Sequence, residues 1–163
     1  MSESKMAGKL RVGIGADHAG YALKEELANA LRDDGYDVKD FGTFSLESVD
    51  YPDIAEAVCR AVVAGECDRA ILICGTGIGM TITANKIPGI RAGAASDTYS
   101  ARMSRAHNNA NVLGMGARVV GTGLAHEIAK VFLDTDFEAG RHARRVDKMN
   151  ALDQCGGGAC GSN

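Results

Sequence analysis

Apolar residues in this chain alternate between short strand-like runs and repeats at helical spacing. Residues 10–16 form an apolar run, and Leu23, Leu27 and Leu31 then recur every four residues until Asp33-Asp34-Gly35 ends the helix. The same order of strand and helix repeats along the chain. Further apolar segments are expected at 36–41, 70–74, 90–95 and 111–113. Helices are expected around 54–62, 78–86, 98–107 and 124–133.

Strands separated by helices predict a parallel sheet, because the chain must cross back between parallel neighbours. With right-handed crossovers we expect an α/β fold, a three-layer α/β/α sandwich around a five-stranded parallel Rossmann-like sheet. One domain is expected over residues 10–153. Residues 1–9 and the Gly/Cys-rich tail at 154–163 are expected to be disordered. Binding sites in such folds form at the carboxyl ends of the strands.

An extra C-terminal helix predicted at 138–152 is too charged to belong to the core. It carries Arg141, His142, Arg144 and Arg145. A polar helix added to a complete sandwich commonly packs on a partner subunit. We therefore expect a homodimer or a dimer of dimers.

Composition narrows the class of protein. The 163 residues are 45% hydrophobic and 24% charged, which is typical of a soluble globular protein. A net charge of −3 without a basic stripe argues against nucleic-acid binding. The apolar runs are far shorter than the roughly 20 residues that cross a bilayer. Because the first residues also lack a signal-peptide pattern, we expect a cytoplasmic protein that does not bind membranes.

The five cysteines are expected to be thiols in a reducing compartment. Cys59 and Cys67 are interpreted as packing residues. Cys155 and Cys160 lie in the tail, where two ligands alone make a poor metal site, and no metal is expected.

Cys74 ends an apolar strand and directly precedes a glycine-rich turn, in the run Ile71-Leu72-Ile73-Cys74-Gly75-Thr76-Gly77-Ile78-Gly79-Met80. The glycines allow consecutive amide N–H groups to converge on an anion at the start of the next helix. Such donors also stabilise a thiolate. The alternative is a tight strand-to-helix turn with a buried structural cysteine, which this pattern alone does not exclude.

Other polar residues lie at the ends of expected elements. Asp17 and His18 follow the first strand, and Arg118 follows a strand end among glycines, so all three are expected at the rim that holds Cys74. His107 ends a helix and is expected at the same rim, where a histidine can exchange a proton. Asp17 could instead cap the first helix, and His107 could be a helix C-terminal cap.

Arg141 and Arg145 are four residues apart and therefore project from one face of the predicted last helix. Together they could clamp one phosphate with charge-assisted hydrogen bonds. The alternative is a solvated basic face without a ligand.

The motifs as a set resemble one family of sugar-phosphate isomerases, typified by ribose-5-phosphate isomerase type B and including the galactose-6-phosphate isomerase subunits. The resemblance covers about residues 10–153. Its segments are, in chain order, Gly15-Ala16-Asp17-His18-Ala19-Gly20, Asp40-Phe41-Gly42-Thr43, Asp50-Tyr51-Pro52, Ile73 through Met80, Ala84-Asn85-Lys86, Pro88-Gly89-Ile90-Arg91, His107-Asn108-Asn109-Ala110-Asn111-Val112, and Gly140-Arg141-His142 with Arg145.

The resemblance implies an aldose–ketose isomerase without metal or organic cofactor. It would open the ring of ribose 5-phosphate and form ribulose 5-phosphate through a cis-enediolate. Cys74 would be the base, Thr76 would help to stabilise the oxyanions, and His107 would be the acid for ring opening. The substrate-binding residues would be Asp17, His18, Gly75, Thr76, Gly77, Ile78, Gly79, Asn108, Arg118, Arg141 and Arg145. Sites in this family lie across a dimer interface.

One branch of the family lacks the cysteine and uses a glutamate where Met80 stands, so Cys74 has no obvious substitute here. A hexose 6-phosphate, such as allose or galactose 6-phosphate, is the alternative substrate. A non-catalytic sugar-phosphate-binding module would tolerate loss of the thiol, whereas the isomerase would not.

Two further alternatives use some of the same residues. Gly13-Ile14-Gly15 suggests a nucleotide-binding module, but the dinucleotide fingerprint requires a third glycine where His18 stands. A cysteine hydrolase would pair Cys74 with His107 for acyl transfer, and it would leave the arginine pair without a role.

Overall fold

The computed structural model describes residues 8–157, which form one five-stranded parallel sheet in the order β2-β1-β3-β5-β4. Its strands are β1 (Arg11–Ala16), β2 (Asp37–Asp40), β3 (Arg69–Cys74), β4 (Ala92–Ala94) and β5 (Val112–Gly116). Its helices are α1 (Tyr21–Asp33), α2 (Tyr51–Val63), α3 (Ile78–Ala84), α4 (Thr98–Ala106), α5 (Thr122–Asp134) and α6 (Ala143–Ala151). The predicted α/β fold with a parallel Rossmann-like sheet is confirmed.

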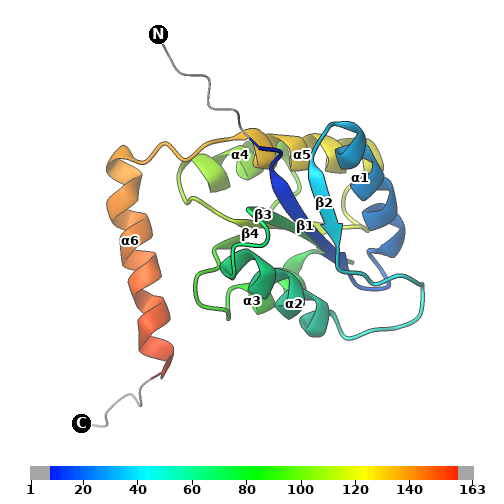
Figure 1. Cartoon of the computed structure of the whole chain (residues 1–163), viewed down its shortest axis with the longest axis horizontal. Helices are drawn as coiled ribbons and strands as arrows, with labels where there is room; N and C mark the ends of the chain where they lie inside the picture. Colours follow the sequence, from blue (N-terminus) through cyan, green and yellow to red (C-terminus); the bar gives the residue numbers. More distant parts are fainter. Residues whose placement is uncertain (1–7, 158–163) are drawn as a thin grey trace.

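Two apolar cores hold the helices on the two faces of the sheet. α1, α4 and α5 cover one face, and α2 and α3 cover the other (Figure 1). Ile73 of β3 and Phe132 of α5 belong to the first core. Leu72 and Cys74 of β3 belong to the second core, together with Met80 of α3. Because successive strand residues point to opposite faces, the side chain of Cys74 faces the layer formed by α2 and α3.

β5 is longer than the apolar segment predicted there, because the strand continues through two glycines. A Cβ added to Gly114 would lie 2.0 Å from Thr81 Oγ1, so the missing side chain is what allows α3 to pack closely on the sheet. Gly116 then pairs with Cys74, and the two strands end at the same edge.

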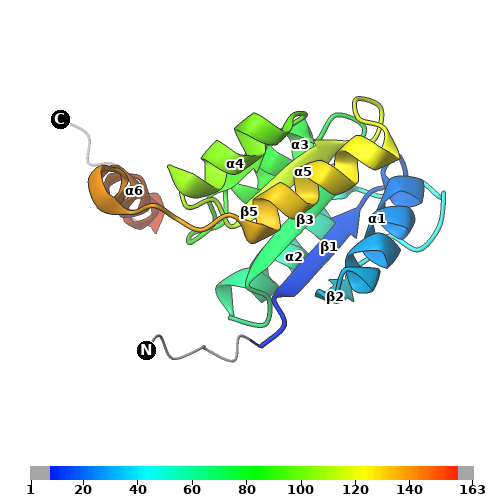
Figure 2. The same cartoon turned by 90° about the horizontal axis from the view of Figure 1, so that it is seen from above.

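The chain leaves the sandwich after α5 as a C-terminal arm, residues 135–157. The single helix predicted at 138–152 starts later, because Ala139 has φ of 53° and Gly140 has φ of 50°. A right-handed helix cannot continue through such angles. A 3₁₀ turn, η1 (Gly140–His142), therefore precedes α6. α6 stands apart from the three layers in both views (Figures 1 and 2), as expected for a helix outside the core.

The arm is tied to the body near both of its ends. The Glu138 N–H donates to the Ala106 carbonyl at 3.0 Å, and the Gly89 N–H donates to Asp153 Oδ2 at 2.8 Å. A short 3₁₀ segment, η2 (Leu152–Gly157), starts at this second contact and continues beyond the predicted domain end at residue 153.

The termini expected to be disordered are residues 1–9 and 154–163, of which residues 1–7 and 158–163 lie outside the described part of the chain. Of the others, residues 8–9 precede β1 and residues 154–157 belong to η2. Within residues 8–157, no helix is both long and apolar enough to cross a membrane.

Candidate active site

Cys74 lies at the carboxyl edge of the sheet and faces the turn that leads into α3. The residue is buried, and its Sγ accepts a hydrogen bond from the Gly77 N–H at 3.1 Å. The sulfur therefore already receives one amide donor from the glycine-rich turn, and such a donor stabilises negative charge on it.

Gly77 makes this turn possible. It has φ of 80°, and a Cβ at this position would lie 2.8 Å from a Met115 backbone atom. Any other residue would be strained there and would push the turn away from β5. Thr76 is exposed on the outside of the turn, and its Oγ1 accepts a hydrogen bond from the Ile78 N–H at 3.2 Å. The turn thus holds one backbone amide against the thiol and carries a hydroxyl on its exposed side.

Asp17 and His18 follow β1 at the same edge of the sheet as Cys74, as predicted. The Asp17 N–H donates to the Ile73 carbonyl at 3.1 Å, which places the end of β1 against the end of β3. Asp17 is buried, and its Oδ1 accepts a hydrogen bond from the Gly20 N–H at 3.1 Å, so it also caps the turn before α1. His18 Nδ1 accepts from the Val49 N–H at 3.3 Å, so a neutral His18 carries its proton on Nε2.

Arg118 completes this group, which we call the carboxyl-edge site (Asp17, His18, Cys74, residues 75–79 and Arg118). The Arg118 N–H donates to the Gly75 carbonyl at 3.1 Å. A Cβ added to Gly75 would lie 3.5 Å from Arg118 Nη1. The exposed guanidinium therefore lies against the turn that follows the thiol, where it can bind an anion.

His107 does not lie at this edge, and the prediction that it shares a rim with Cys74 is wrong within one chain. The Ala70 N–H, at the start of β3, donates to the Asn111 carbonyl at 3.0 Å. Cys74 lies four residues further, about 13 Å along the strand. A crossover helix runs antiparallel to its strands, so α4 ends where β5 begins and leaves His107 at the amino edge.

A second group, the amino-edge cluster (His107, Asn108, Glu138, Arg141, His142 and Arg145), lies there. His107 is the C-cap residue of α4, as the alternative interpretation predicted. Its ring stacks on that of His142, with centroids 4.1 Å apart and planes 11° apart. Burial lowers the pKa of His142, and the neighbouring charges of His107 and Arg141 lower it further.

Glu138 joins the stacked histidines. Its Oε2 lies 3.9 Å from His107 Nε2 and 3.8 Å from His142 Nε2. Within the described residues, these three side chains are the one group whose possible metal-ligand atoms lie within 4.8 Å of one another. The two rings are nearly parallel, however, and their nitrogen lone pairs lie in the ring planes, so the lone pairs do not converge on one ion. The Cys155–Cys160 pair considered above lies outside the side chains that the structure describes.

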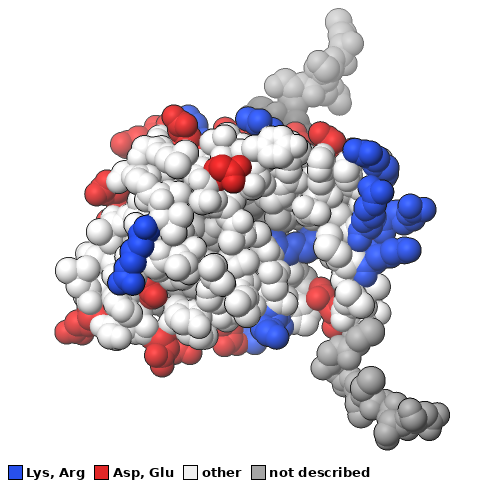
Figure 3. All heavy atoms as spheres, turned by 180° about the vertical axis from the view of Figure 1, so that it is seen from behind, with Lys and Arg blue, Asp and Glu red and all other residues white. Residues whose placement is uncertain are grey.

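Arg141 and Arg145 are exposed on η1 and α6. Basic side chains gather on this projecting helix (Figure 3), and they include Arg144 and Lys148. Within residues 8–157, none of these four cations pairs with a carboxylate. An unpaired cluster of this kind favours binding of an external anion.

A cavity of about 380 Å³ lies between α6 and the body of the protein. Asn108 borders it together with Met149 and Asn150, whereas Cys74 does not. The exposed Asn108 amide therefore faces open space at the amino edge, away from the thiol of its own chain.

Sequence reasoning assigned no role to Glu138 or His142. The two residues are four apart in the sequence, a spacing that places side chains on the same face of a helix. Ala139 and Gly140 interrupt that helix, so the spacing alone does not predict the contact. Only the fold places both side chains against His107.

The thiol, the amide-rich turn and the arginine at one edge of a parallel sheet define an α/β enzyme that acts on a small anionic substrate. The chain belongs to the Ribose/Galactose Isomerase family, whose family model matches residues 12–149.

Individual relatives agree with this assignment. The chain is 48% identical to ribose-5-phosphate isomerase B of Escherichia coli over 144 residues, which are 88% of this chain and 97% of that protein. It is 45% identical to D-erythrulose-4-phosphate isomerase of Pectobacterium atrosepticum over 141 residues, covering 86% and 93% of the two chains. The structure of ribose-5-phosphate isomerase B from Clostridium thermocellum superimposes with a TM-score of 0.88 at 53% identity, covering 90% of this chain and 99% of that one.

Proposed function

We propose that this protein is an aldose–ketose isomerase that interconverts ribose 5-phosphate and ribulose 5-phosphate, a reaction of the pentose phosphate pathway. Its family membership and its extensive similarity to ribose-5-phosphate isomerases support this activity. The observation that carries the proposal is Cys74 Sγ, held 3.1 Å from the Gly77 amide in a glycine-rich turn at the carboxyl edge of the sheet.

The proposed chemistry uses residues of this chain and no cofactor. Cys74, as the thiolate, removes the proton from C2 of the open-chain aldose, and the electron pair moves to the C1 carbonyl oxygen to give a cis-enediolate. Transfer of the O2 hydroxyl proton to O1 and return of the carbon-bound proton to C1 then give the ketose. Backbone amides of residues 75–79 and the Thr76 hydroxyl stabilise the negative oxygens. Asp17 and His18 bind the substrate on its sugar and phosphate sides, and Arg118 binds the phosphate end.

The remaining predicted residues act from a second copy of the chain. Within one chain the amino-edge cluster faces away from Cys74, and its arginines have no carboxylate partner among residues 8–157. Ile78 and Ile82, next to the Cys74 turn, are each 56% exposed and offer an apolar contact surface. We infer a homodimer in which His107, Asn108, Arg141 and Arg145 of one protomer complete the carboxyl-edge site of its partner.

Active-site complementation tests this two-chain arrangement. Cys74→Ala and His107→Ala homodimers should each keep only a small residual activity, because every site lacks one of the two groups. Mixing them to equilibrium makes half of the dimers mixed, and each mixed dimer has one intact site, so about one quarter of the wild-type activity should return. A mixture that keeps only this residual activity although native mass spectrometry detects the mixed dimer would place both groups in the same chain's site.

Substrate choice is tested with purified protein in a coupled assay. We expect kcat/KM to be higher for ribose 5-phosphate than for allose 6-phosphate or galactose 6-phosphate. A preference for either hexose phosphate would reassign the substrate but keep the reaction type, and no turnover of any of the three would contradict the proposed substrates.

A cytoplasmic location is part of the proposal, because the reaction needs Cys74 as a free thiol and a reducing compartment keeps it so.

A further inference from the structure

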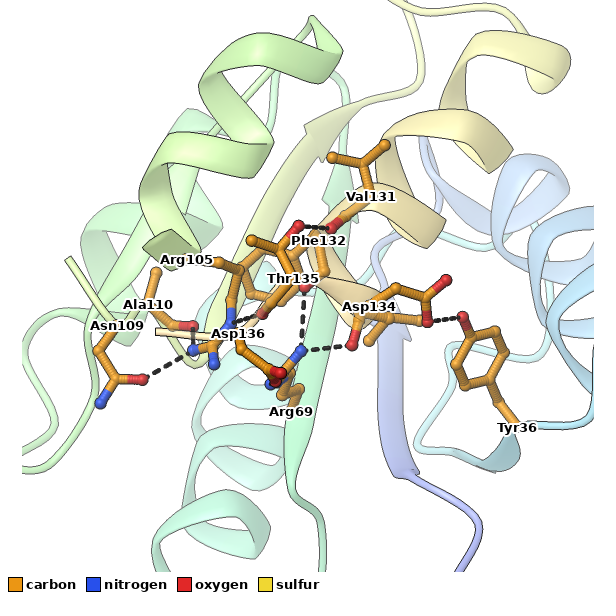
Figure 4. Close-up of polar contacts among 11 residues, drawn as sticks. Tyr36, Arg69, Arg105, Asn109, Ala110, Val131, Phe132, Asp134, Thr135 and Asp136 are labelled. Atoms are coloured by element: carbon orange, nitrogen blue, oxygen red, sulfur yellow. Dashed lines mark hydrogen bonds and ion pairs between the residues drawn. The ribbon is translucent and has the colours of Figure 1, made fainter. Parts of the chain in front are cut away.

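The turn that carries His107 and Asn108 is fixed by a buried arginine with no role in the proposed function. Arg105 is only 5% exposed. Its Nη1 donates to Asn109 Oδ1 at 2.9 Å and to the Ala110 carbonyl at 2.6 Å, and its Nε donates to the Thr135 carbonyl at 3.1 Å. Figure 4 shows Arg105 lying between the end of α4 and the residues that follow α5. One guanidinium thus joins the His107 turn to the start of the C-terminal arm.

A second arginine holds the same turn from the other side. Arg91 Nε donates to the Asn109 carbonyl at 3.0 Å, and Arg91 Nη1 donates to Asn150 Oδ1 in α6 at 2.9 Å. Asn109 is therefore held at its side chain by Arg105 and at its carbonyl by Arg91. These contacts link the turn to both ends of the arm that carries Arg141.

Asn109 is also the residue where the backbone turns. Its φ is 48°, in the left-handed region that glycine and asparagine adopt most readily. The Asn109 N–H donates to the Arg105 carbonyl at 3.1 Å and closes the end of α4. Burial lowers the pKa of Arg105 to about 10, so the guanidinium stays charged at neutral pH and its hydrogen bonds are charge-assisted.

We propose that Arg105, through its hydrogen bond to Asn109, is a positioning residue that holds His107 in place for ring opening. This inference rests on the proposed role of His107 as the ring-opening acid. His107 is two residues from both Arg105 and Asn109, so their contact fixes the backbone from which the His107 ring projects. Arg105 is itself buried, so its proposed effect is on the turn and not through contact with the substrate.

The test is a double-mutant cycle measured as kcat/KM for ribose 5-phosphate. Asn109→Gly keeps the left-handed backbone but removes the acceptor for Arg105, and Asn109→Asp retains an acceptor. Because small misplacements of a catalytic group can cost about 100-fold, we expect Asn109→Gly to lose about 10- to 100-fold and Asn109→Asp to lose no more than about threefold. Circular dichroism verifies that both variants are folded.

The decisive comparison repeats Asn109→Gly in a His107→Ala background. If Asn109 acts through His107, the double variant should match His107→Ala within about threefold, because the group being positioned is already absent. The proposal would be overturned if the losses in kcat/KM from Asn109→Gly and His107→Ala multiplied in the double variant. It would also be overturned if Asn109→Gly kept wild-type activity, or if Asn109→Gly and Asn109→Asp lost equal activity. Wild-type activity in His107→Ala alone would instead contradict the proposed function, so the two failures are distinguishable.

Discussion

Cys74→Ala should abolish isomerisation while leaving the protein folded and able to bind the sugar phosphate. General-base catalysis typically contributes about 10²–10⁴ in rate, and we expect a loss near the upper end of that range. Met80 cannot replace Cys74 as the base, because its side chain is fully buried and has no group that accepts a proton. One branch of the family uses a glutamate at this position instead. The measurements are kcat in a coupled assay and the Kd of ribose 5-phosphate by calorimetry.

Cys67→Ala is the matched control, because it makes the same chemical change at a buried thiol near the opposite edge of the sheet. Burial raises the pKa of the Cys67 thiol, and its N–H donates to the Ala61 carbonyl, so it belongs to the packing between α2 and β3. We expect Cys67→Ala to keep most of its turnover. Near-normal turnover in Cys74→Ala, or an equal loss in both variants, would remove Cys74 from the mechanism.

Lys24→Met should destabilise the fold by about 3 kcal/mol, since removing one partner of a buried ion pair leaves the other uncompensated. Lys24 is fully buried in α1, and its Nζ lies 2.6 Å from Asp40 Oδ2 and 2.6 Å from Glu25 Oε1. Asp40 Oδ1 accepts a hydrogen bond from the Gly42 N–H at 2.8 Å, so the pair also holds the loop after β2. Urea unfolding at a fixed protein concentration measures the change in free energy.

Lys39→Met is the matched control for this prediction. Lys39 pairs with Glu66 at 2.8 Å, but both side chains are 56% exposed, and exposed pairs contribute little. We expect its unfolding midpoint to be close to that of the wild type. Equal midpoints for the two variants would show that burial of Lys24 adds nothing to the pair.

Much of the fold could be predicted because each element carries its own local pattern. The leucines of α1 recur at helical spacing, and β3 is a continuous apolar run of the length that a buried parallel strand requires. The hydrophobic pattern predicted too short a strand at β5, because Gly114 is a residue typical of turns but lies within the strand. A glycine is needed at this strand position because Thr81, a residue distant in sequence, packs closely against it.

The carboxyl-edge site could also be predicted, because its residues follow strand ends and parallel strands end at one edge. Asp17 directly follows β1 and Cys74 is the last residue of β3, and the fold places these two strand ends together. His107 was placed wrongly because its position depends on the direction of α4 relative to β5. The bracing of His107 by Arg105 could not be foreseen, since a buried arginine is indistinguishable in sequence from an exposed one.

The sequence by itself determined the strand and helix order, the parallel sheet and the thiol beside a glycine-rich turn, because these depend on side chains close together in the chain. The tertiary structure alone decided that the thiol and His107 occupy opposite edges, that His107 stacks on His142, and that Lys24 is buried. Each of these follows from how elements distant in sequence pack against one another, and local hydrophobic periodicity contains no information about that packing.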